Sequence, residues 1–167
     1  MIYRYSTNII ATEKDINKLK KYALSGQDIF NPNKARFQKI IKQHSIRTKL
    51  INKLKELGFL DDRTVGTTVV LHSTDNCLMQ QWHTDFDPVS TKKAETKPLG
   101  VLLALENDTY FNVYKKKRIT MEKGDLLIFD GDTVHAGAAY TKNNTRIHMY
   151  LDSKFVKRQY NKTYLKL

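Results

Sequence analysis

The spacing of apolar residues divides the chain into a helical first third and a longer part that is rich in β-strands. Ile16, Leu19 and Ala23 recur at helical spacing within the segment TEKDINKLKKYAL. Thr12 begins this segment and Asp15 follows three residues later, which is the arrangement of a capping box. We therefore predict an amphipathic helix that begins at Thr12.

A second helix is predicted after a break at residues 25–26 and 31–33. From Lys34 to Leu57 apolar residues again recur at helical spacing, and Gly58 follows at the place where helices commonly end in a left-handed residue. The pattern predicts one long amphipathic helix over this range. His44 lies near the border of its apolar face, and we interpret it as a core histidine and not as a ligand.

Beyond Gly58 the apolar period changes towards two, and β-branched residues gather in short segments separated by turn residues. We predict eight short strands, a number typical of a sandwich or a barrel. They span residues 66–72, 79–84, 99–105, 110–113, 118–121, 125–129, 135–139 and 146–151.

The chain shows neither an internal repeat nor a second domain, so we expect a single domain over residues 1–167. Residues 1–60 would form a helical support, residues 65–152 a β-rich core and residues 153–167 a basic C-terminal tail. The expected fold class is mostly β with N-terminal helices.

Composition narrows the class of protein. The 167 residues include a single cysteine, Cys77, which excludes an internal disulfide framework and a zinc site made from two thiolates of one chain. No apolar run approaches the ~20 residues of a membrane-spanning helix, and the N-terminus lacks a secretory pattern. We expect a monomer in the cytoplasm or another reducing intracellular compartment, with no membrane partner.

The net charge of +12 leaves a nucleic-acid partner open. The excess is mostly lysine, 22 Lys to 7 Arg, and it is scattered, whereas proteins that bind phosphates and bases often favour the forked donors of arginine. Lys92, Lys93, Lys97 and residues 115–118 are candidates for a phosphate path. The alternative is a solvated, lysine-rich surface.

Three residues of the β-rich part are of the types that bind iron in proteins, two histidines and one aspartate. His83 and Asp85 are two apart at the end of the strand predicted over residues 79–84, so in extended chain their side chains project to one side. His135 would complete two imidazoles and one carboxylate on one face of an ion, an arrangement that leaves open positions and suits non-haem Fe(II). Arg146 lies on the next predicted strand, and its guanidinium can clamp a carboxylate with two hydrogen bonds.

In order and spacing, His83, Asp85, His135 and Arg146 resemble the H-x-D…H…R pattern of the Fe(II)/2-oxoglutarate-dependent dioxygenase superfamily. The segments QWHTDFDP and GDLLIFDGDTVHAG look like its two metal-binding regions. The resemblance implies a double-stranded β-helix, a jelly-roll-like core backed by two helices. It also implies Fe(II), the co-substrate 2-oxoglutarate and O2, with Arg146 on the distal carboxylate of 2-oxoglutarate.

Four further residues are assigned to the site by strand alternation. His148 and Tyr150 share the facing of Arg146 and are expected to bind the co-substrate, with lining of the substrate cavity or filling of the barrel as the alternatives. Gln81 and Asp87 are expected to meet substrate, although Asp87 precedes Pro88 and could instead orient the end of the strand.

The second contact of the co-substrate carboxylate stays open. Many prolyl-hydroxylase-like members of the superfamily place a supporting tyrosine where this chain reads TTVVLH, residues 67–72. Thr68, Tyr110 and Tyr150 are possible substitutes, and the sequence does not rank them.

The resemblance implies hydroxylation of a C–H bond of a substrate. Members of the nucleic-acid dealkylase branch usually carry a second arginine six residues after the first, where this chain has Asp152. The prolyl-hydroxylase-like branch is therefore favoured, with a protein or peptide side chain as the expected substrate. Two alternatives are a nucleic-acid base oxidase or dealkylase of the same superfamily and a non-enzymatic β-barrel binding module.

Overall fold

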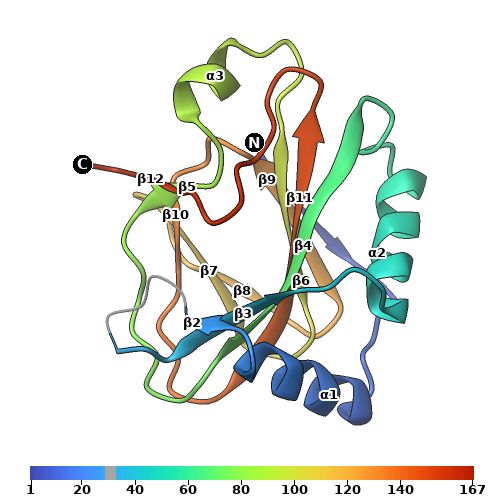
Figure 1. Cartoon of the computed structure of the whole chain (residues 1–167), viewed down its shortest axis with the longest axis vertical. Helices are drawn as coiled ribbons and strands as arrows, with labels where there is room; N and C mark the ends of the chain where they lie inside the picture. The colour runs from blue at the N-terminus through green and yellow to red at the C-terminus, as the bar shows by residue number, and fades with distance from the viewer. Residues whose placement is uncertain (29–32) are drawn as a thin grey trace.

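The computed structural model describes residues 1–28 and 33–167 as two antiparallel sheets and three helices (Figure 1). The larger sheet has, in spatial order, the strands β1 (Ile2–Ser6), β9 (Asp125–Asp130), β6 (Leu99–Ala104), β11 (Asn144–Ser153), β4 (Arg63–Ser73), β3 (Arg36–Ile40) and β2 (Gln27–Asp28). The smaller sheet has β12 (Tyr164–Leu165), β5 (His83–Thr84), β10 (His135–Gly137), β7 (Thr109–Val113) and β8 (Ile119–Met121). The expected fold class, mostly β, is confirmed.

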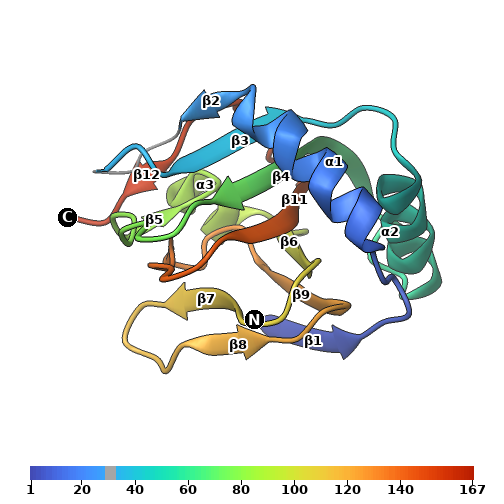
Figure 2. The same cartoon turned by 90° about the horizontal axis from the view of Figure 1, so that it is seen from below.

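Two helices cover the outer face of the larger sheet, α1 (Glu13–Leu24) and α2 (Ser45–Glu56) (Figure 2). Leu19 and Leu50 are among the helix residues buried against this sheet, and Ile147 is among the strand residues that meet them. Because side chains alternate along a strand, the neighbours of Ile147 point to the opposite face, toward the smaller sheet. One strand therefore supplies both the core and the interior between the sheets.

The predicted start of α1 is confirmed. Thr12 is the N-cap, its hydroxyl accepts a hydrogen bond from the Asp15 backbone N–H, and the Asp15 carboxylate accepts one from the Thr12 backbone N–H. This reciprocal pairing satisfies two donors that the helix leaves free.

The predicted second helix is wrong over its first part. Residues 36–40 form β3, which pairs along β4, and α2 begins only at Ser45. Pairing of β3 with β4 outweighs the weak helical spacing of this short segment. His44 caps α2, because its Nδ1 accepts a hydrogen bond from the Ile46 backbone N–H at 3.2 Å. Residues 31 and 32 of the predicted break lie outside the described residues.

Each of the eight strand segments predicted from alternation contains a strand. The sequence missed β1 and β2 in the segment expected to be a helical support, the short helix α3 (Pro88–Lys93), and β12 in the segment expected to be a tail. β12 pairs with β5, so the end of the chain lies beside the strand of His83. No helix among the described residues is long and apolar enough to cross a membrane.

Candidate metal centre

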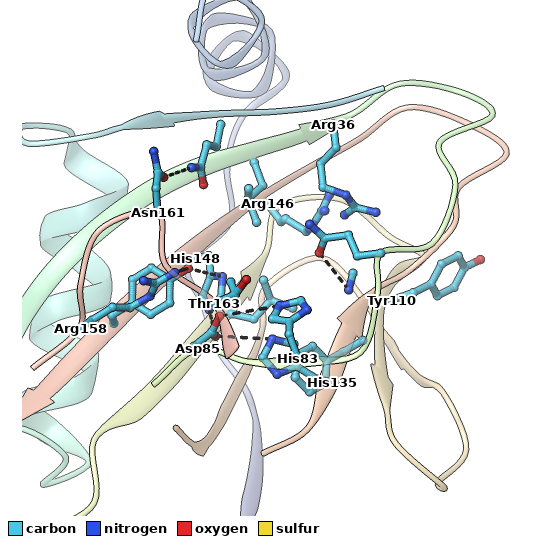
Figure 3. A pocket seen from close by; sticks show the side chains of 17 residues that line it. Arg36, His83, Asp85, Tyr110, His135, Arg146, His148, Arg158, Asn161 and Thr163 are labelled. Atoms are coloured by element: carbon cyan, nitrogen blue, oxygen red, sulfur yellow. Dashed lines mark hydrogen bonds and ion pairs between the residues drawn. The ribbon is translucent and has the colours of Figure 1, made fainter. Parts of the chain in front are cut away.

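The paired strands β5 and β10 place two histidines side by side. His83 and His135 are partners in the ladder, and their ring centroids are 4.6 Å apart. Asp85 directs its carboxylate at both rings (Figure 3), with 3.9 Å from His83 Nε2 to Oδ1 and 3.5 Å from His135 Nε2 to Oδ2. One ligand atom of each residue lies within 4.8 Å of those of the other two, so the structure brings the three expected metal ligands together.

Backbone carbonyls determine which ring nitrogen each histidine presents. His83 Nδ1 is 2.7 Å from the Gln81 carbonyl oxygen, and His135 Nδ1 is 2.9 Å from the Thr133 carbonyl oxygen. A carbonyl can only accept, so Nδ1 carries a proton in both rings, and the neutral form of each ring has its lone pair on Nε2. Both lone pairs face Asp85, as metal coordination through Nε2 requires.

The charge states also suit a cation. Burial alone would raise the pKa of Asp85, but the neighbouring groups, His135 and His148 first, lower it to about 2. Burial, together with His135, lowers the pKa of His83, so this ring is neutral at neutral pH. Oδ2 of Asp85 is buried and has no hydrogen-bond partner within the described chain. Two neutral imidazoles and an ionised carboxylate fit the donor set of a non-haem Fe(II) site.

Aromatic rings hold the second histidine in place. Phe111 stacks on His135 at 4.9 Å between ring centroids, and Phe129 meets the same ring edge-on at 5.2 Å. These contacts restrict rotation of the imidazole and keep water from that side of the cavity.

Arg146 lies in the same cavity and is only 3% exposed. Its Nη1 and Nη2 each donate to the Ser73 hydroxyl at 3.2 Å, and the guanidinium lies over the Tyr140 ring at 5.1 Å. The partners of Arg146 are therefore neutral, and its charge is not paired with a carboxylate of the described chain.

The sequence missed a second buried arginine in this cavity, Arg36, which comes from β3 (Figure 3). Its Nη2 donates to the Ala138 carbonyl at 2.7 Å, and its buried Nε has no hydrogen-bond partner in the part of the chain described. Burial and the nearby charge of Arg146 lower the pKa of Arg36 to about 10, which leaves it charged at neutral pH. Two cations that repel each other in one cavity favour an anionic ligand.

His148 and Tyr150 also line the cavity, but they lie next to the metal carboxylate. His148 Nε2 is 3.4 Å from Asp85 Oδ2, and the Tyr150 hydroxyl is 3.4 Å from His148 Nδ1. Burial lowers the pKa of His148 to about 3 and raises the pKa of Tyr150, so both are neutral.

The two expected substrate contacts lie away from the cavity lining. Gln81 is exposed, because β5 is only two residues long and its alternation does not extend back to residue 81, and Gln80 lines the cavity instead. Asp87 caps α3 by accepting hydrogen bonds from the backbone N–H groups of Val89 and Ser90, which agrees with the alternative of an orienting role.

Of the three candidates for the second carboxylate contact, Tyr110 and Tyr150 line the cavity, and the Thr68 hydroxyl accepts a hydrogen bond from Arg47. The C-terminal segment adds Arg158, Asn161 and Thr163 to the lining. No pattern in the sequence indicates these last three residues, because their position depends on how the chain returns to the smaller sheet.

No protein-family model matches this chain, and no curated protein matches it. Solved structures do match. The viral collagen prolyl hydroxylase vCPH from Paramecium bursaria Chlorella virus-1, in complex with 2-oxoglutarate, is 15% identical with a TM-score of 0.65, over 90% of this chain and 94% of that chain. HygX from Streptomyces hygroscopicus, with nickel and 2-oxoglutarate bound, is 8% identical with a TM-score of 0.66, over 92% and 83%. The chain has the fold of the 2-oxoglutarate/Fe(II) oxygenases.

A prolyl-4-hydroxylase from Pseudomonas putida shares this oxygenase fold, at 8% identity and a TM-score of 0.59 over 95% of this chain and 92% of that chain. The likeness to the oxygenases is one of fold, since the identities are low. The resemblance seen in the sequence is thus confirmed for the fold, and the residues of the cavity carry the argument about function.

Proposed function

We propose that the protein is an Fe(II)- and 2-oxoglutarate-dependent oxygenase that hydroxylates a C–H bond, built on a double-stranded β-helix core. The observation that carries the proposal is a buried His-Asp-His cluster, with both imidazole lone pairs facing the carboxylate, in the same cavity as two buried arginines that have no acidic partner among the described residues.

His83, Asp85 and His135 would hold the iron. Together, bound Fe(II) and 2-oxoglutarate supply the oxidising chemistry, in which O2 is consumed, the keto acid becomes succinate and CO2, and a substrate C–H becomes C–OH. The task of the protein residues is to fix the ligand geometry, exclude water and orient both organic molecules. The Nδ1 hydrogen bonds and the aromatic contacts of His135 serve the first two purposes.

Arg146 would bind the distal carboxylate of 2-oxoglutarate, and we add Arg36 as the second cation at that end of the cavity. A dicarboxylate would neutralise positive charge that has no acidic partner among the described residues. The co-substrate contacts expected of His148 and Tyr150 remain predictions, supported by their place in the same cavity.

For the substrate we propose a protein or peptide side chain. The support is the likeness in fold to two proteins named prolyl hydroxylases, although HygX shows that the fold also occurs with hygromycin B bound. The C-terminal segment and β3 both reach the cavity, and they would contribute to substrate choice.

The proposal is tested by adding 2-oxoglutarate to Fe(II)-loaded protein without oxygen and recording the visible spectrum. We expect a charge-transfer band, and succinate formation once O2 is admitted. His83→Ala and His135→Ala should abolish both signals. His44→Asn is a matched control, since it lies outside the cavity and asparagine also caps helices well. No band in the wild-type protein, with metal affinity unaffected by the keto acid, would favour the binding module.

A further inference from the structure

The last part of the chain is built against the metal centre. In β12, Tyr164 and Leu165 pair with Thr84 and His83 of β5. Between β11 and β12, the chain places Arg158 beside the cavity that His148 also lines (Figure 3). Its guanidinium reaches the Tyr150 hydroxyl. Part of the segment expected to be a tail, residues 158–165, therefore lies along the site.

Arg158 makes two non-covalent contacts with Tyr150. Its guanidinium lies over the Tyr150 ring at 4.1 Å from the centroid, and its Nη2 donates to the Tyr150 hydroxyl at 3.3 Å. The hydroxyl oxygen therefore already accepts one hydrogen bond, and its own proton is available for another partner.

The available partner is His148. The Tyr150 hydroxyl lies 3.4 Å from His148 Nδ1, and a phenol that donates to Nδ1 leaves the imidazole proton on Nε2. That nitrogen is 3.4 Å from Asp85 Oδ2. Both Nε2 and Oδ2 are buried, and neither has a conventional hydrogen-bond partner among the described residues. The N–H is thus placed to meet the carboxylate with a small adjustment.

We propose that Arg158 is a positioning residue of the metal site, which acts through Tyr150 and His148 to aim an N–H at Oδ2 of Asp85 and so orients this carboxylate toward the metal. The inference rests on the proposed function, because it needs a metal at Asp85. It means that the C-terminal segment completes the coordination geometry from outside the ligand set, as partners behind metal ligands commonly do.

Arg158 also organises its own loop, since its Nη1 donates to the carbonyls of Gln159 and Lys162. Loss of its side chain could therefore disturb the segment in general. Tyr150→Phe is the cleaner variant, because it removes only the hydroxyl and keeps the ring on which Arg158 stacks.

The experiment is a titration of metal-free protein with Co(II), in the absence of 2-oxoglutarate, read by the dissociation constant and the visible d–d spectrum. Tyr150→Phe should weaken Co(II) binding by about 10–100-fold, the usual effect of losing a group behind a metal ligand. Arg158→Met should act in the same direction, and the double variant should be no weaker than the weaker single one. Tyr114→Phe and Arg63→Met, outside the cavity lining, are the matched controls.

Wild-type Co(II) affinity and spectrum in Tyr150→Phe would overturn the inference. Weakening in Tyr150→Phe with wild-type affinity in Arg158→Met would overturn the role of Arg158. The unfolding midpoint of metal-free Tyr150→Phe is measured as well. If the loss of stability is large enough to account for the lost Co(II) affinity, the effect is merely structural and the inference is overturned. If the wild-type protein binds neither Co(II) nor Fe(II), both proposals fail. If it binds them and forms the 2-oxoglutarate band while the variants match it, only this inference fails.

Discussion

At the scale of single residues, both imidazoles of the candidate metal centre are oriented by the same kind of local hydrogen bond. Each donates its Nδ1 proton to the carbonyl of the residue two positions earlier, Gln81 for His83 and Thr133 for His135. The bond is made within three residues of chain, so it forms as soon as the local backbone is in place. The tautomer that suits a metal is thus set locally, whereas the meeting of the two rings requires the sheet.

Replacing Arg146 by Lys tests the co-substrate end of the cavity. Lysine keeps the charge but loses the planar fork, so the affinity for 2-oxoglutarate should fall by about tenfold or more. Metal binding should persist, because within the described residues no hydrogen bond or ion pair joins Arg146 to the three proposed metal ligands. The measurement is a 2-oxoglutarate titration of the anaerobic iron protein, with Arg47→Lys on α2 as the control. Loss of iron with unchanged 2-oxoglutarate affinity would show a structural role instead.

His72 provides a pH prediction that does not involve the metal. Burial lowers its pKa from 6.5 to about 4, and its Nδ1 lies 2.9 Å from the Thr145 hydroxyl. Between pH 6.5 and about pH 4, His72 binds a proton in the unfolded chain but not in the folded chain. The free energy of unfolding therefore falls as the pH falls through this range. The slope is at most about 1.4 kcal/mol per pH unit for one such group.

Chemical denaturation of metal-free protein from pH 7 to pH 4 measures this slope. In His72→Gln the unfolding free energy should fall less steeply than in the wild-type protein. Part of the slope should remain, since the pKa values of His83 and His148 are lowered as well. Equal slopes in the two proteins would refute the contribution of His72.

At the scale of elements, β11 shows how one strand serves core and site. Arg146, His148 and Tyr150 face the cavity, whereas Ile147 and Met149, which alternate with them, are buried against the helices. Period-two alternation in the sequence predicted which of these residues share a face. The prediction holds because a long strand paired on both sides cannot rotate about its axis.

Strand β10 supplies a prediction at this scale. A Cβ on Gly137 would overlap with Gln80 Oε1 and lie 2.7 Å from Arg36 Nη1, both at the ends of flexible side chains. Gly137→Ala should therefore fold but displace Arg36 from its place in the cavity. We expect weaker 2-oxoglutarate binding with metal affinity nearly unchanged, measured by parallel titrations. An unchanged 2-oxoglutarate affinity would remove Arg36 from the co-substrate site.

At the scale of the whole molecule, the net charge of +12 is partly engaged in contacts within the protein at the candidate phosphate path. Lys97 is paired with Asp130 at 3.4 Å and Asp132 at 3.1 Å, and Arg118 donates to Asn112 while it lies over the Tyr110 ring. Two of the candidate cations are therefore engaged within the protein. This weakens the alternative of a nucleic-acid substrate.

The salt dependence of oligonucleotide binding tests this reading. Three phosphate contacts on a single strand would give a slope of log affinity against log salt of about −2. We expect a shallower slope, measured by fluorescence anisotropy over a series of salt concentrations. A slope of about −2 or steeper that flattens in the double variant Lys92→Glu/Lys93→Glu, with lower substrate oxidation, would instead support nucleic acid as the substrate.

The sequence by itself determined what depends on near neighbours along the chain. The capping box of Thr12, the eight alternating strand segments and the shared facing of Arg146 and His148 are all local patterns. A capping box satisfies the same backbone donors in any helix. Alternate residues of any strand lie on the same face. These features therefore follow from sequence spacing alone.

Tertiary structure alone decided what depends on distant partners. Arg36 lies in β3 and not in a helix because β4 was there to pair with it, and only that pairing turns its side chain into the cavity. Arg158 reaches Tyr150 because β12 returns to β5, a contact that no spacing in the sequence indicates. Gln81 lies outside the cavity lining because β5 begins only at His83, so strand alternation does not reach residue 81. Pairing across the fold gives a short segment its conformation when its own propensity is weak, and here it also decided which charged side chains surround the candidate metal centre.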